Sequence, residues 1–302
     1  MCLIYLRLQH ISQNLLKLNV VLVFTMEGNK SSKQFKAIKN IENAMTHVAD
    51  TIIVEEALQI NINGKPYTIT MRTPGSDKAL IRGLFFTEGI YSGKEKLKVK
   101  TIETTEDGIL SSVNVWIPQN QIGGTYYQSR SMLSVSSCGI CGKRELDDLM
   151  LGGKRLKPKS KLDTALLVPM FETMRKSQVN FEETGGSHAA AAFDINGRLL
   201  AIEEDIGRHN AVDKVIGNLL DKSQLDKASC MLVSGRVSFE IVSKTYKAGI
   251  PYLAAVSSPS SLSIETAEAM GITLLAFCRG NAMTCYSNAN QLMQNINQVL
   301  TP

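Results

Sequence analysis

Short apolar runs alternate with helical patterns along the C-terminal third of the chain. The runs have the length and composition of buried strands, and the segments between them have a helical period that stops at Gly249 and at Gly271. This β-α-β-α-β order predicts parallel strands joined by crossover helices, which is typical of an α/β protein. In chain order, the predicted strands and helices are 229–233, 237–248, 252–256, 262–270 and 272–277.

Earlier segments have clear but less regular patterns. Alternating apolar residues on both sides of Asn63-Gly64 predict a hairpin over 57–71, and the same reasoning applies to the strands around Asn196-Gly197. A helical period begins after Pro74, where Ser76 and Asp77 are the candidate caps, and ends at Gly89. The residues around Trp116 predict another strand, and 206–220 predict another helix.

The N-terminal residues are the least informative part of the chain. We expect 1–50 to be poorly structured, with Met26 a possible true start, since the apolar run within 1–25 is too short to span a bilayer and lacks a signal-peptide cleavage pattern. Residues rich in Gly, Ser and charge flank a short segment near 138–141 and suggest a mobile arm there. We therefore expect a smaller α+β part over 51–150 and an α/β part over 151–302.

Composition excludes some classes of function. The 302 residues carry a net charge of +5, much of it in two lysine- and arginine-rich runs that are typical of solvated faces, with an anionic partner as the alternative. With aromatic residues at 6%, no nucleic-acid partner is indicated. Six cysteines in a chain of this length favour a reducing, cytoplasmic location rather than a disulfide framework. The two runs comprise Lys94, Lys96, Lys98 and Lys100, then Lys154, Arg155, Lys157, Lys159 and Lys161.

The loops after the three C-terminal strands indicate a ligand site. Parallel strands place these loops at the same sheet edge, outside their carboxyl ends, where open α/β sheets bind ligands. Two of the loops lead into helix N-termini, which favour phosphate, and two arginines add bidentate contacts. The alternative is that the glycine and serine residues only allow the chain to turn. The three loops are Ser234-Gly235-Arg236, Ser257-Ser258-Pro259-Ser260 and Cys278-Arg279-Gly280-Asn281.

Cys138 and Cys141 form a C-x-x-C pair followed by Lys143 and Arg144. A structural zinc site needs four ligands, and no second pair with suitable spacing is present. Nearby cations lower a thiol pKa, so a thiol-disulfide exchanger is possible. However, the pair does not lie between a strand and a long helix of a small domain, as it does in thioredoxin. A third possibility is a persulfide carrier, which needs an exposed thiolate. These readings stay open on the residues alone.

His188 and His209 could each act as a catalytic base. His188 begins a strand of small residues, and His209 lies near a helix start beside Arg208, Asp205 and Asp213. A Cys–His nucleophile pair is conceivable, but a hydrogen-bonded structural histidine is the favoured interpretation of both. Cys230, inside an apolar run, is expected in the core.

Six stretches in a fixed order resemble the FdhD-type sulfur carriers, accessory proteins needed for active formate dehydrogenase. The resemblance extends from about Val54 to Gln291. It implies a cytidine-deaminase-like three-layer fold without the catalytic zinc, with a mostly parallel C-terminal sheet, and a homodimer. The matching stretches are FFTEGI (85–90), SSCGICG (136–142), TGGSHAAA (184–191), EDIGRHNAVDK (204–214), LVSGRVSFEIV (232–242) and FCRGNAMTCYS (277–287).

The same resemblance implies the chemistry. Members take sulfur from a cysteine desulfurase and pass it to the molybdenum bis(molybdopterin guanine dinucleotide) cofactor, so a guanine nucleotide would mimic that cofactor. The persulfide position falls on Cys138, and Cys141 has an open role. Ala282 departs from some relatives, which have an arginine there. The cofactor-binding stretch falls on Phe277, Cys278, Arg279, Gly280, Asn281 and Ala282, to which the loop argument adds Ser234, Gly235 and Arg236.

The combined hypothesis is a cytoplasmic sulfurtransferase-type carrier with formate dehydrogenase as its client and no membrane or metal site. Two alternatives differ in what the cysteines do. A thiol-disulfide oxidoreductase would cycle Cys138 and Cys141 through a disulfide, whereas a cofactor-binding chaperone would need the loops and not the cysteines.

Overall fold

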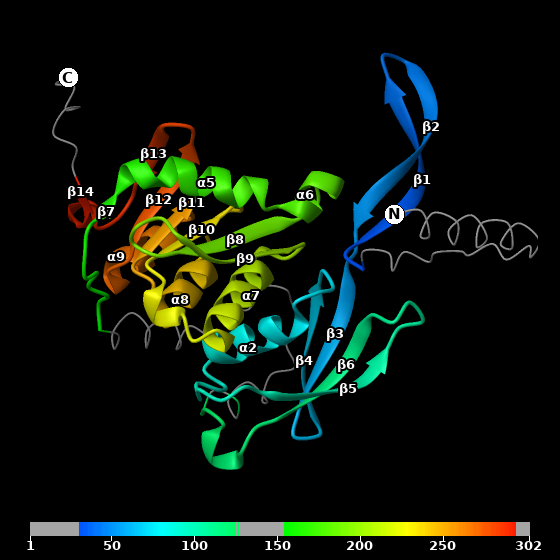
Figure 1. Cartoon of the computed structure of the whole chain (residues 1–302), viewed down its shortest axis with the longest axis horizontal. Helices are drawn as coiled ribbons and strands as arrows, with labels where there is room; N and C mark the ends of the chain where they lie inside the picture. Colours follow the sequence, from blue (N-terminus) through cyan, green and yellow to red (C-terminus); the bar gives the residue numbers. More distant parts are fainter. Residues whose placement is uncertain (1–29, 125, 127–153, 294–302) are drawn as a thin grey trace, which may run out of the picture.

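The computed structural model describes residues 30–124, 126 and 154–293. Two sheets with helices packed on them form most of the molecule, and a separate hairpin projects from it (Figure 1). The strands are β1 (Ser32–Ile41), β2 (Ala44–Ile53), β3 (Glu56–Ile62), β4 (Lys65–Arg72), β5 (Lys98–Thr104), β6 (Leu110–Trp116), β7 (Leu162–Asp163), β8 (His188–Phe193), β9 (Leu199–Asp205), β10 (Cys230–Val233), β11 (Tyr252–Ala255), β12 (Thr273–Arg279), β13 (Ala282–Cys285) and β14 (Leu292–Met293). The α-helices are α2 (Asp77–Thr87), α5 (Leu167–Lys176), α6 (Val179–Thr184), α7 (Arg208–Asp221), α8 (Phe239–Lys247) and α9 (Ser261–Met270).

The C-terminal sheet has six strands in the order β13-β12-β11-β10-β8-β9. The expected parallel unit is confirmed, because β10 pairs parallel with β11, and β11 with β12. The expectation of a mostly parallel sheet is wrong at the level of pairing, since the other three strand pairs are antiparallel. The cause is local: β8–β9 and β12–β13 are hairpins that extend the parallel unit at its two sides, which makes the sheet mixed.

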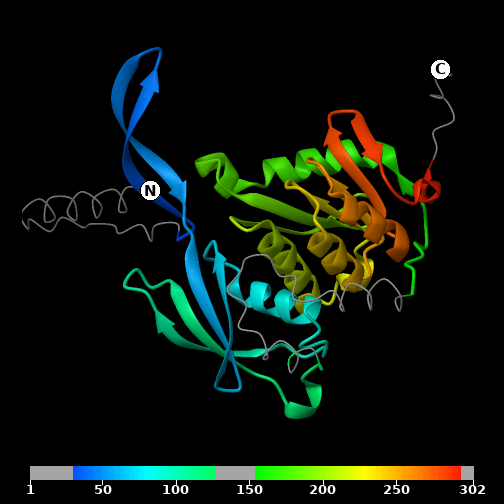
Figure 2. The ribbon, with the colours of Figure 1, turned by 180° about the vertical axis from the view of Figure 1, so that it is seen from behind.

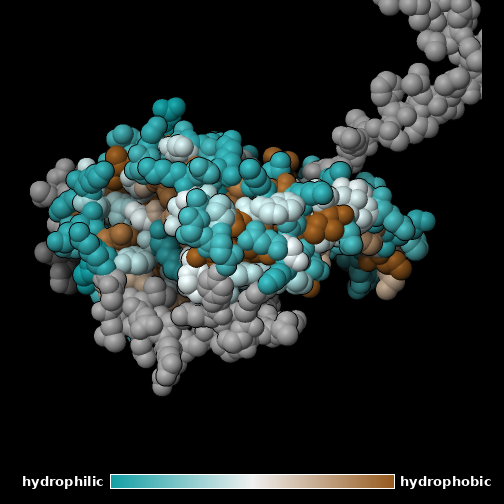
Figure 3. All heavy atoms as spheres, turned by 90° about the horizontal axis from the view of Figure 1, so that it is seen from below, coloured by the Kyte–Doolittle hydropathy of each residue, from teal (hydrophilic) through white to brown (hydrophobic). Residues whose placement is uncertain are grey.

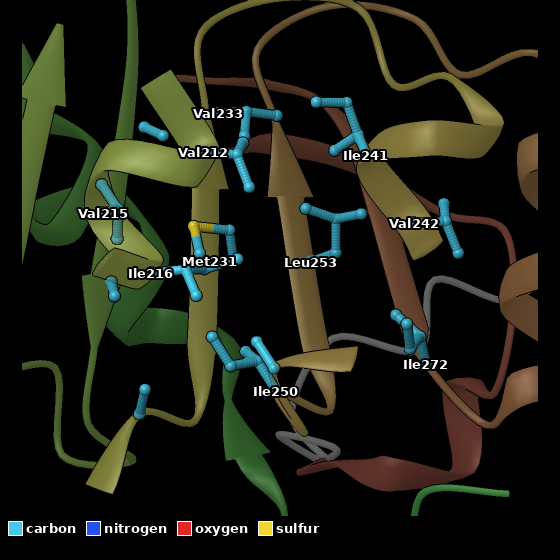
Figure 4. Packing of buried hydrophobic residues seen from close by; sticks show 14 of the residues in the cluster. Val212, Val215, Ile216, Met231, Val233, Ile241, Val242, Ile250, Leu253 and Ile272 are labelled. Atoms are coloured by element: carbon cyan, nitrogen blue, oxygen red, sulfur yellow. The ribbon is translucent and has the colours of Figure 1, made fainter. Parts of the chain in front are cut away.

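Both faces of this sheet are covered by helices. On one face, apolar residues of α7, α8 and α9 pack on β10, β11 and β12, and the close-up in Figure 4 shows Val212, Ile241 and Leu253 among them. On the other face, Met170 and Met174 of α5 pack in a second apolar cluster with Phe193 of β8 and with side chains of β10, β11 and β12. Cys230 is fully buried in this second cluster, as expected from its apolar run. The likeness to cytidine deaminases stays a prediction.

The N-terminal sheet has the order β4-β3-β6-β5, and α2 packs against it through Ile81 and Phe85. The Asn63-Gly64 hairpin is confirmed: both residues have positive φ, at 50° and 77°, as a tight two-residue turn requires. The expected cap of α2 differs from the structure. Ser76 makes no capping hydrogen bond, and the carboxylate of Asp77 instead pairs with the Arg72 guanidinium at 2.8 Å.

Helices α2 and α7 join the two sheets at very short range. A Cβ added to Gly83 would lie 1.8 Å from the carbonyl oxygen of Asp213, and one added to Gly217 would lie 1.9 Å from that of Ala79. Beside this crossing, the buried Lys244 ammonium of α8 lies 2.8 Å from the Asp213 carboxylate. The two parts are therefore packed as one unit. Glycine is required at positions 83 and 217 because the two helix backbones touch there.

Residues 32–53 form a long hairpin of β1 and β2, although the sequence suggested a poorly structured lead-in up to residue 50. Its strands have polar and apolar residues on both faces, so no clean alternation marks them. The two basic runs, 94–100 and 154–161, have exposed lysine and arginine side chains, as expected for solvated faces. Within the described ranges, no helix has the length and apolar character needed to cross a membrane.

Candidate functional site

Four strands end at one edge of the C-terminal sheet. Strands β9, β10, β11 and β12 run in the same direction, since β9 and β10 are both antiparallel to β8 while β10, β11 and β12 pair in parallel. Because β8 runs the opposite way, its first residue, His188, lies at this same edge. This is the edge at which the loops after the parallel strands predict a ligand site. Figure 2 shows the six-stranded sheet from behind.

The first two predicted loops do meet. Val237, which follows Ser234-Gly235-Arg236, forms a parallel bridge with Pro259. The Val237 N–H donates to the Ser258 carbonyl at 3.1 Å, and the Ser260 N–H donates to the Val237 carbonyl at 3.0 Å. The segments 234–237 and 257–260 are thus held side by side.

The third predicted loop is a hairpin instead. Strand β12 continues through Cys278 and Arg279, and Arg279 pairs directly with Ala282 of β13, so only Gly280 and Asn281 form the turn. The apolar run ended at Phe277, which explains the error, because a bulge with φ of 53° at Phe277 lets the strand go on. The strand end still adjoins the second loop: the Phe277 N–H donates to the Ser257 carbonyl at 3.3 Å.

Side chains of this hairpin differ in accessibility. Phe277 is 40% exposed, and Arg279 and Ala282 are exposed too, while Cys278 points into the core. Burial raises the pKa of the Cys278 thiol to about 11. Cys278 is therefore a neutral packing residue, and the groups available to a ligand here are Phe277, Arg279 and the turn.

Ser234 and Gly235 hold the edge together. The Ser234 hydroxyl accepts from the Ala189 N–H at 2.9 Å, while the Ser234 N–H donates to the Ala189 carbonyl at 3.0 Å. A Cβ on Gly235 would lie 3.2 Å from Nδ1 of His188. These two predicted binding residues thus shape the site by close contact with β8, whereas Arg236 is exposed and free to reach a ligand.

Two cationic side chains surround His188. Burial lowers the pKa of His188, and the positive charges of Arg208 and Arg236 lower it further. The imidazole is therefore neutral near pH 7 while the guanidinium groups stay charged. Arg208 Nε is buried and has no hydrogen-bond partner within the described ranges. This part of the edge therefore combines positive charge with a buried N–H group that the described residues leave unpaired.

His209 is a hydrogen-bonded structural histidine, as the sequence favoured. Its Nε2 lies 2.9 Å from the Glu240 carboxylate and 3.0 Å from the Ser238 hydroxyl. The hydrogen bond from His209 holds the pKa of Glu240 below its usual range, against the effect of burial. The pair ties the start of α7 to the start of α8 beside Arg236.

The turn that presents Arg208 is fixed by the buried carboxylate of Asp205. That carboxylate lies 2.7 Å from the Lys214 ammonium and accepts from the backbone N–H of Gly207 at 2.8 Å and of Thr73 at 3.2 Å. In the sequence, Asp205 and Arg208 stand out only as neighbours of His209. The EDIGRH stretch could have indicated Arg208, because it sits where a strand passes directly into a helix N-terminus.

Cys138 and Cys141 lie outside the described residues. The three cysteines that are described, Cys230, Cys278 and Cys285, all have a raised pKa because of burial. None of the three is therefore an activated thiolate at neutral pH. In the described ranges, no three His, Cys, Asp or Glu side chains gather as metal ligands.

The fold and site define an α/β protein with a cationic sheet edge. The FdhD/NarQ family matches residues 53–293, and the chain belongs to this family. The resemblance inferred from the motifs is confirmed. A curated relative called "Sulfur carrier protein FdhD" from Streptomyces coelicolor is 40% identical over 271 residues, covering 85% of this chain and 94% of the relative.

Other comparisons agree. A protein of the same name from Thermoplasma acidophilum is 39% identical over 282 residues, covering 89% of this chain and 97% of its own. The Mycobacterium tuberculosis protein of that name is 41% identical over 260 residues, with 80% and 92% coverage. A crystal structure from Desulfotalea psychrophila, assigned as a formate dehydrogenase accessory protein, has a TM-score of 0.67 at 22% identity, covering 87% of this chain and 99% of that one. This last likeness concerns the fold alone.

Proposed function

We propose that this chain is a sulfur carrier that serves the maturation of formate dehydrogenase. Its membership of the FdhD/NarQ family is the observation that carries the proposal, together with relatives of about 40% identity that are called sulfur carriers. The Cys138–Cys141 pair with Lys143 and Arg144 supplies the chemistry, since adjacent cations favour a thiolate. The raised pKa values of Cys230, Cys278 and Cys285 argue against those thiols as the nucleophile.

Cys138 is the proposed carrier residue. Its thiolate attacks the outer sulfur of a persulfide on the donor, a cysteine desulfurase. A new S–S bond forms at Cys138, the S–S bond of the donor breaks, and the donor cysteine leaves as a thiolate. Delivery of the outer sulfur atom to the acceptor returns the Cys138 thiolate.

The proposed acceptor is the molybdenum bis(molybdopterin guanine dinucleotide) cofactor, whose metal supplies the two electrons that the transferred sulfur takes up. The residues at the sheet edge fit the phosphates of such a group. Arg208 has a buried Nε without a partner in the described ranges, Arg236 and Arg279 are exposed nearby, and a side chain at Gly235 would fill the space against His188. Phe277 offers a half-exposed ring for stacking.

Mass spectrometry of the intact protein tests the carrier step. The full chain is incubated with a cysteine desulfurase and L-cysteine, with Cys138→Ala as the test variant and Cys141→Ala as the matched control. We expect a reducible gain of one sulfur atom in the wild type and in Cys141→Ala, and no gain in Cys138→Ala. Loss of two hydrogens without any gain of sulfur would instead identify a thiol-disulfide oxidoreductase.

The affinity for GDP, a mimic of half the cofactor, tests the binding site. Arg236→Ala should weaken binding, while Arg198→Ala is the control, since Arg198 is also exposed but follows the β8–β9 turn at the opposite sheet edge. Equal affinities of both variants and the wild type would contradict the proposed site. Formate dehydrogenase maturation that needs Arg236 but not Cys138 would indicate a cofactor-binding chaperone.

A further inference from the structure

Residues 154–161, which we call the basic strap, carry the second basic run of the sequence. Five of these eight residues are lysine or arginine, and none is aspartate or glutamate. The first basic run differs, because Glu95 interrupts it and Glu103, Glu106 and Asp107 follow it closely. In Figure 1 the strap is the green segment that climbs the left-hand side of the molecule to β7. The strap is thus a segment of a single sign of charge.

The backbone of the strap is held at both of its ends. The Tyr246 hydroxyl of α8 donates to the Lys154 carbonyl at 3.0 Å. The hydroxyl of the fully buried Tyr252 donates to the Ser160 carbonyl at 2.8 Å. Lysines that only keep a surface solvated need no such anchoring of their backbone.

Gly271 lets the strap lie directly on the end of α9. It has a φ of 77°, and a Cβ at this position would lie 2.5 Å from the Leu156 carbonyl oxygen. The Leu156 N–H donates to the Met270 carbonyl at 2.8 Å, and its side chain packs against the apolar cluster under α7, α8 and α9. Because the backbone is already fixed, little conformational entropy is lost when a partner binds the side chains that it presents.

The charged side chains of the strap point outwards. Arg155, Lys157 and Lys159 are exposed, whereas Leu156 and Pro158 between them are half-buried. This alternation is that of an extended chain lying on a surface, in which every second residue is about 6–7 Å from the next. Figure 3 shows mostly hydrophilic atoms at the left-hand end, the side on which the strap lies in Figure 1. The cations therefore form a row on the surface.

Most of this charge is not neutralised by the rest of the described chain. Arg155 lies 3.5 Å from the Glu268 carboxylate. Among the described residues, no ion pair involves Lys157, Lys159 or Lys161. A row of cations without counter-charges creates a local positive potential, which attracts an anionic surface and fixes its orientation.

An acidic protein surface fits the strap better than a nucleic acid does. Proteins that bind single strands without sequence preference combine cations with aromatic rings on which the bases stack. The aromatic residues that touch the strap do not offer such rings, since Tyr252 is fully buried and Tyr246 packs against the apolar cluster. Carboxylates on a protein surface need only the charges, which the strap supplies.

The strap lies at the edge of the C-terminal sheet that is opposite to the proposed ligand site. Tyr252 is the first residue of β11, and Gly271 comes just before β12. The loops 234–237 and 257–260, in contrast, follow the other ends of β10 and β11. A partner bound to the strap therefore leaves the ligand edge free. The strap also follows the C-x-x-C pair closely in the sequence.

We propose that the basic strap is the surface on which the sulfur donor docks, through an acidic surface of the donor. The inference rests on the proposed function for the identity of that partner. Docking next to the segment that carries the C-x-x-C pair raises the effective concentration of the donor persulfide. The donor and the acceptor then use opposite edges of the same sheet, so neither has to leave before the other binds.

The affinity for a cysteine desulfurase tests the strap. Two variants each replace three exposed lysines with glutamate and so change the net charge equally. Calorimetric titration of the full chain with the desulfurase measures the Kd at low and at physiological salt, and circular dichroism checks that each variant is folded. The substitutions are Lys157→Glu, Lys159→Glu and Lys161→Glu in the strap variant, and Lys94→Glu, Lys96→Glu and Lys98→Glu in the control variant.

We expect the strap variant to bind about tenfold more weakly or worse, and the control variant to bind like the wild type, because screened charges act only over a short range. Added salt should weaken the wild type more than the strap variant. A wild type that does not bind, a strap variant that binds as well as the wild type, or an equal loss in both variants would overturn the proposal. Tighter binding of a single-stranded oligonucleotide, lost in the strap variant, would overturn it in favour of a nucleic-acid partner.

This binding measurement involves no sulfur transfer, so its outcome is separate from that of the mass-spectrometric test. A strap variant that gains sulfur from a small-molecule persulfide as fast as the wild type, but more slowly from the desulfurase, would support the docking surface. A wild type that binds the desulfurase through the strap and gains no sulfur would keep the docking surface and contradict the carrier function.

Discussion

Gly235 lies directly against His188, so close that a Cβ at position 235 would be 3.2 Å from Nδ1 of the imidazole and 3.5 Å from Cβ of Arg208. Because Gly235 needs no positive φ, Gly235→Ala adds only this contact and must displace His188 or Arg208 by a few tenths of an ångström. We expect the variant to fold normally and to bind GDP about tenfold more weakly, the cost of one impaired charge-assisted contact.

Calorimetric titration with GDP measures that loss. Gly124→Ala is the control, since a Cβ there meets no atom of the described residues within 4 Å. An unchanged affinity in Gly235→Ala would contradict a ligand site against His188 and Arg208.

The neutral state of His188 makes a prediction about pH. Burial and the charges of Arg208 and Arg236 lower the pKa of His188 in the folded protein, whereas histidine in an unfolded chain has a pKa of about 6.5. As the pH falls through that value, the unfolded state takes up the proton first, so stability is lost until the pH lies below the folded pKa. Above pH 7 this effect is absent.

Urea unfolding of the wild type between pH 8 and pH 5 should therefore show a decline in the free energy of unfolding that is smaller in His188→Gln. His47→Gln, on the exposed β1–β2 hairpin, serves as the matched control. Superimposable profiles for the wild type and His188→Gln would contradict the inferred neutral imidazole.

Much of the fold could be predicted from the sequence because its signals are local. The Asn63-Gly64 turn and the apolar runs of β10 and β11 depend on neighbouring residues, and the structure has them where the pattern indicated. The β1–β2 hairpin could not be predicted this way, because strands exposed on both faces need no alternation of apolar and polar residues. Strand β12 was predicted too short because the bulge at Phe277 interrupts its apolar pattern.

The site was predictable in part for the same reason. Parallel topology correctly brought 234–236 and 257–260 together, since that follows from the order of the elements. Arg208 was missed as a site residue, because its position beside His188 results from the antiparallel β8–β9 pair and from the buried Asp205–Lys214 ion pair. Such contacts between distant segments have no local signature.

The crossing of α2 and α7 predicts a strong effect on stability. Gly217→Ala directs a methyl group at the Ala79 carbonyl, 1.9 Å away, and neither helix backbone can move without disturbing the Asp213–Lys244 ion pair beside it. We expect a loss of about 1–3 kcal/mol or more in the free energy of unfolding, the usual cost of overpacking. Thermal and urea unfolding measure it, with Gly124→Ala again as control. A variant as stable as the wild type would show that the helices are less tightly packed than the structure indicates.

Ala282 lies within 277–282, the stretch to which the sequence resemblance assigned cofactor binding. It is exposed at the start of β13 and pairs directly with Arg279, whose Nε donates to the Val256 carbonyl at 3.3 Å. Ala282→Arg would add a second guanidinium beside the proposed nucleotide site, and one charge-assisted hydrogen bond to a phosphate corresponds to about tenfold or more in affinity. The opposing effect is repulsion from Arg279 across the strand pair, which is small on an exposed surface. We therefore expect tighter GDP binding with a steeper dependence on salt.

Ala282→Gln, which adds length without charge, is the control. An equal gain in GDP affinity in both variants would show that contact area, and not phosphate recognition, limits binding at this edge.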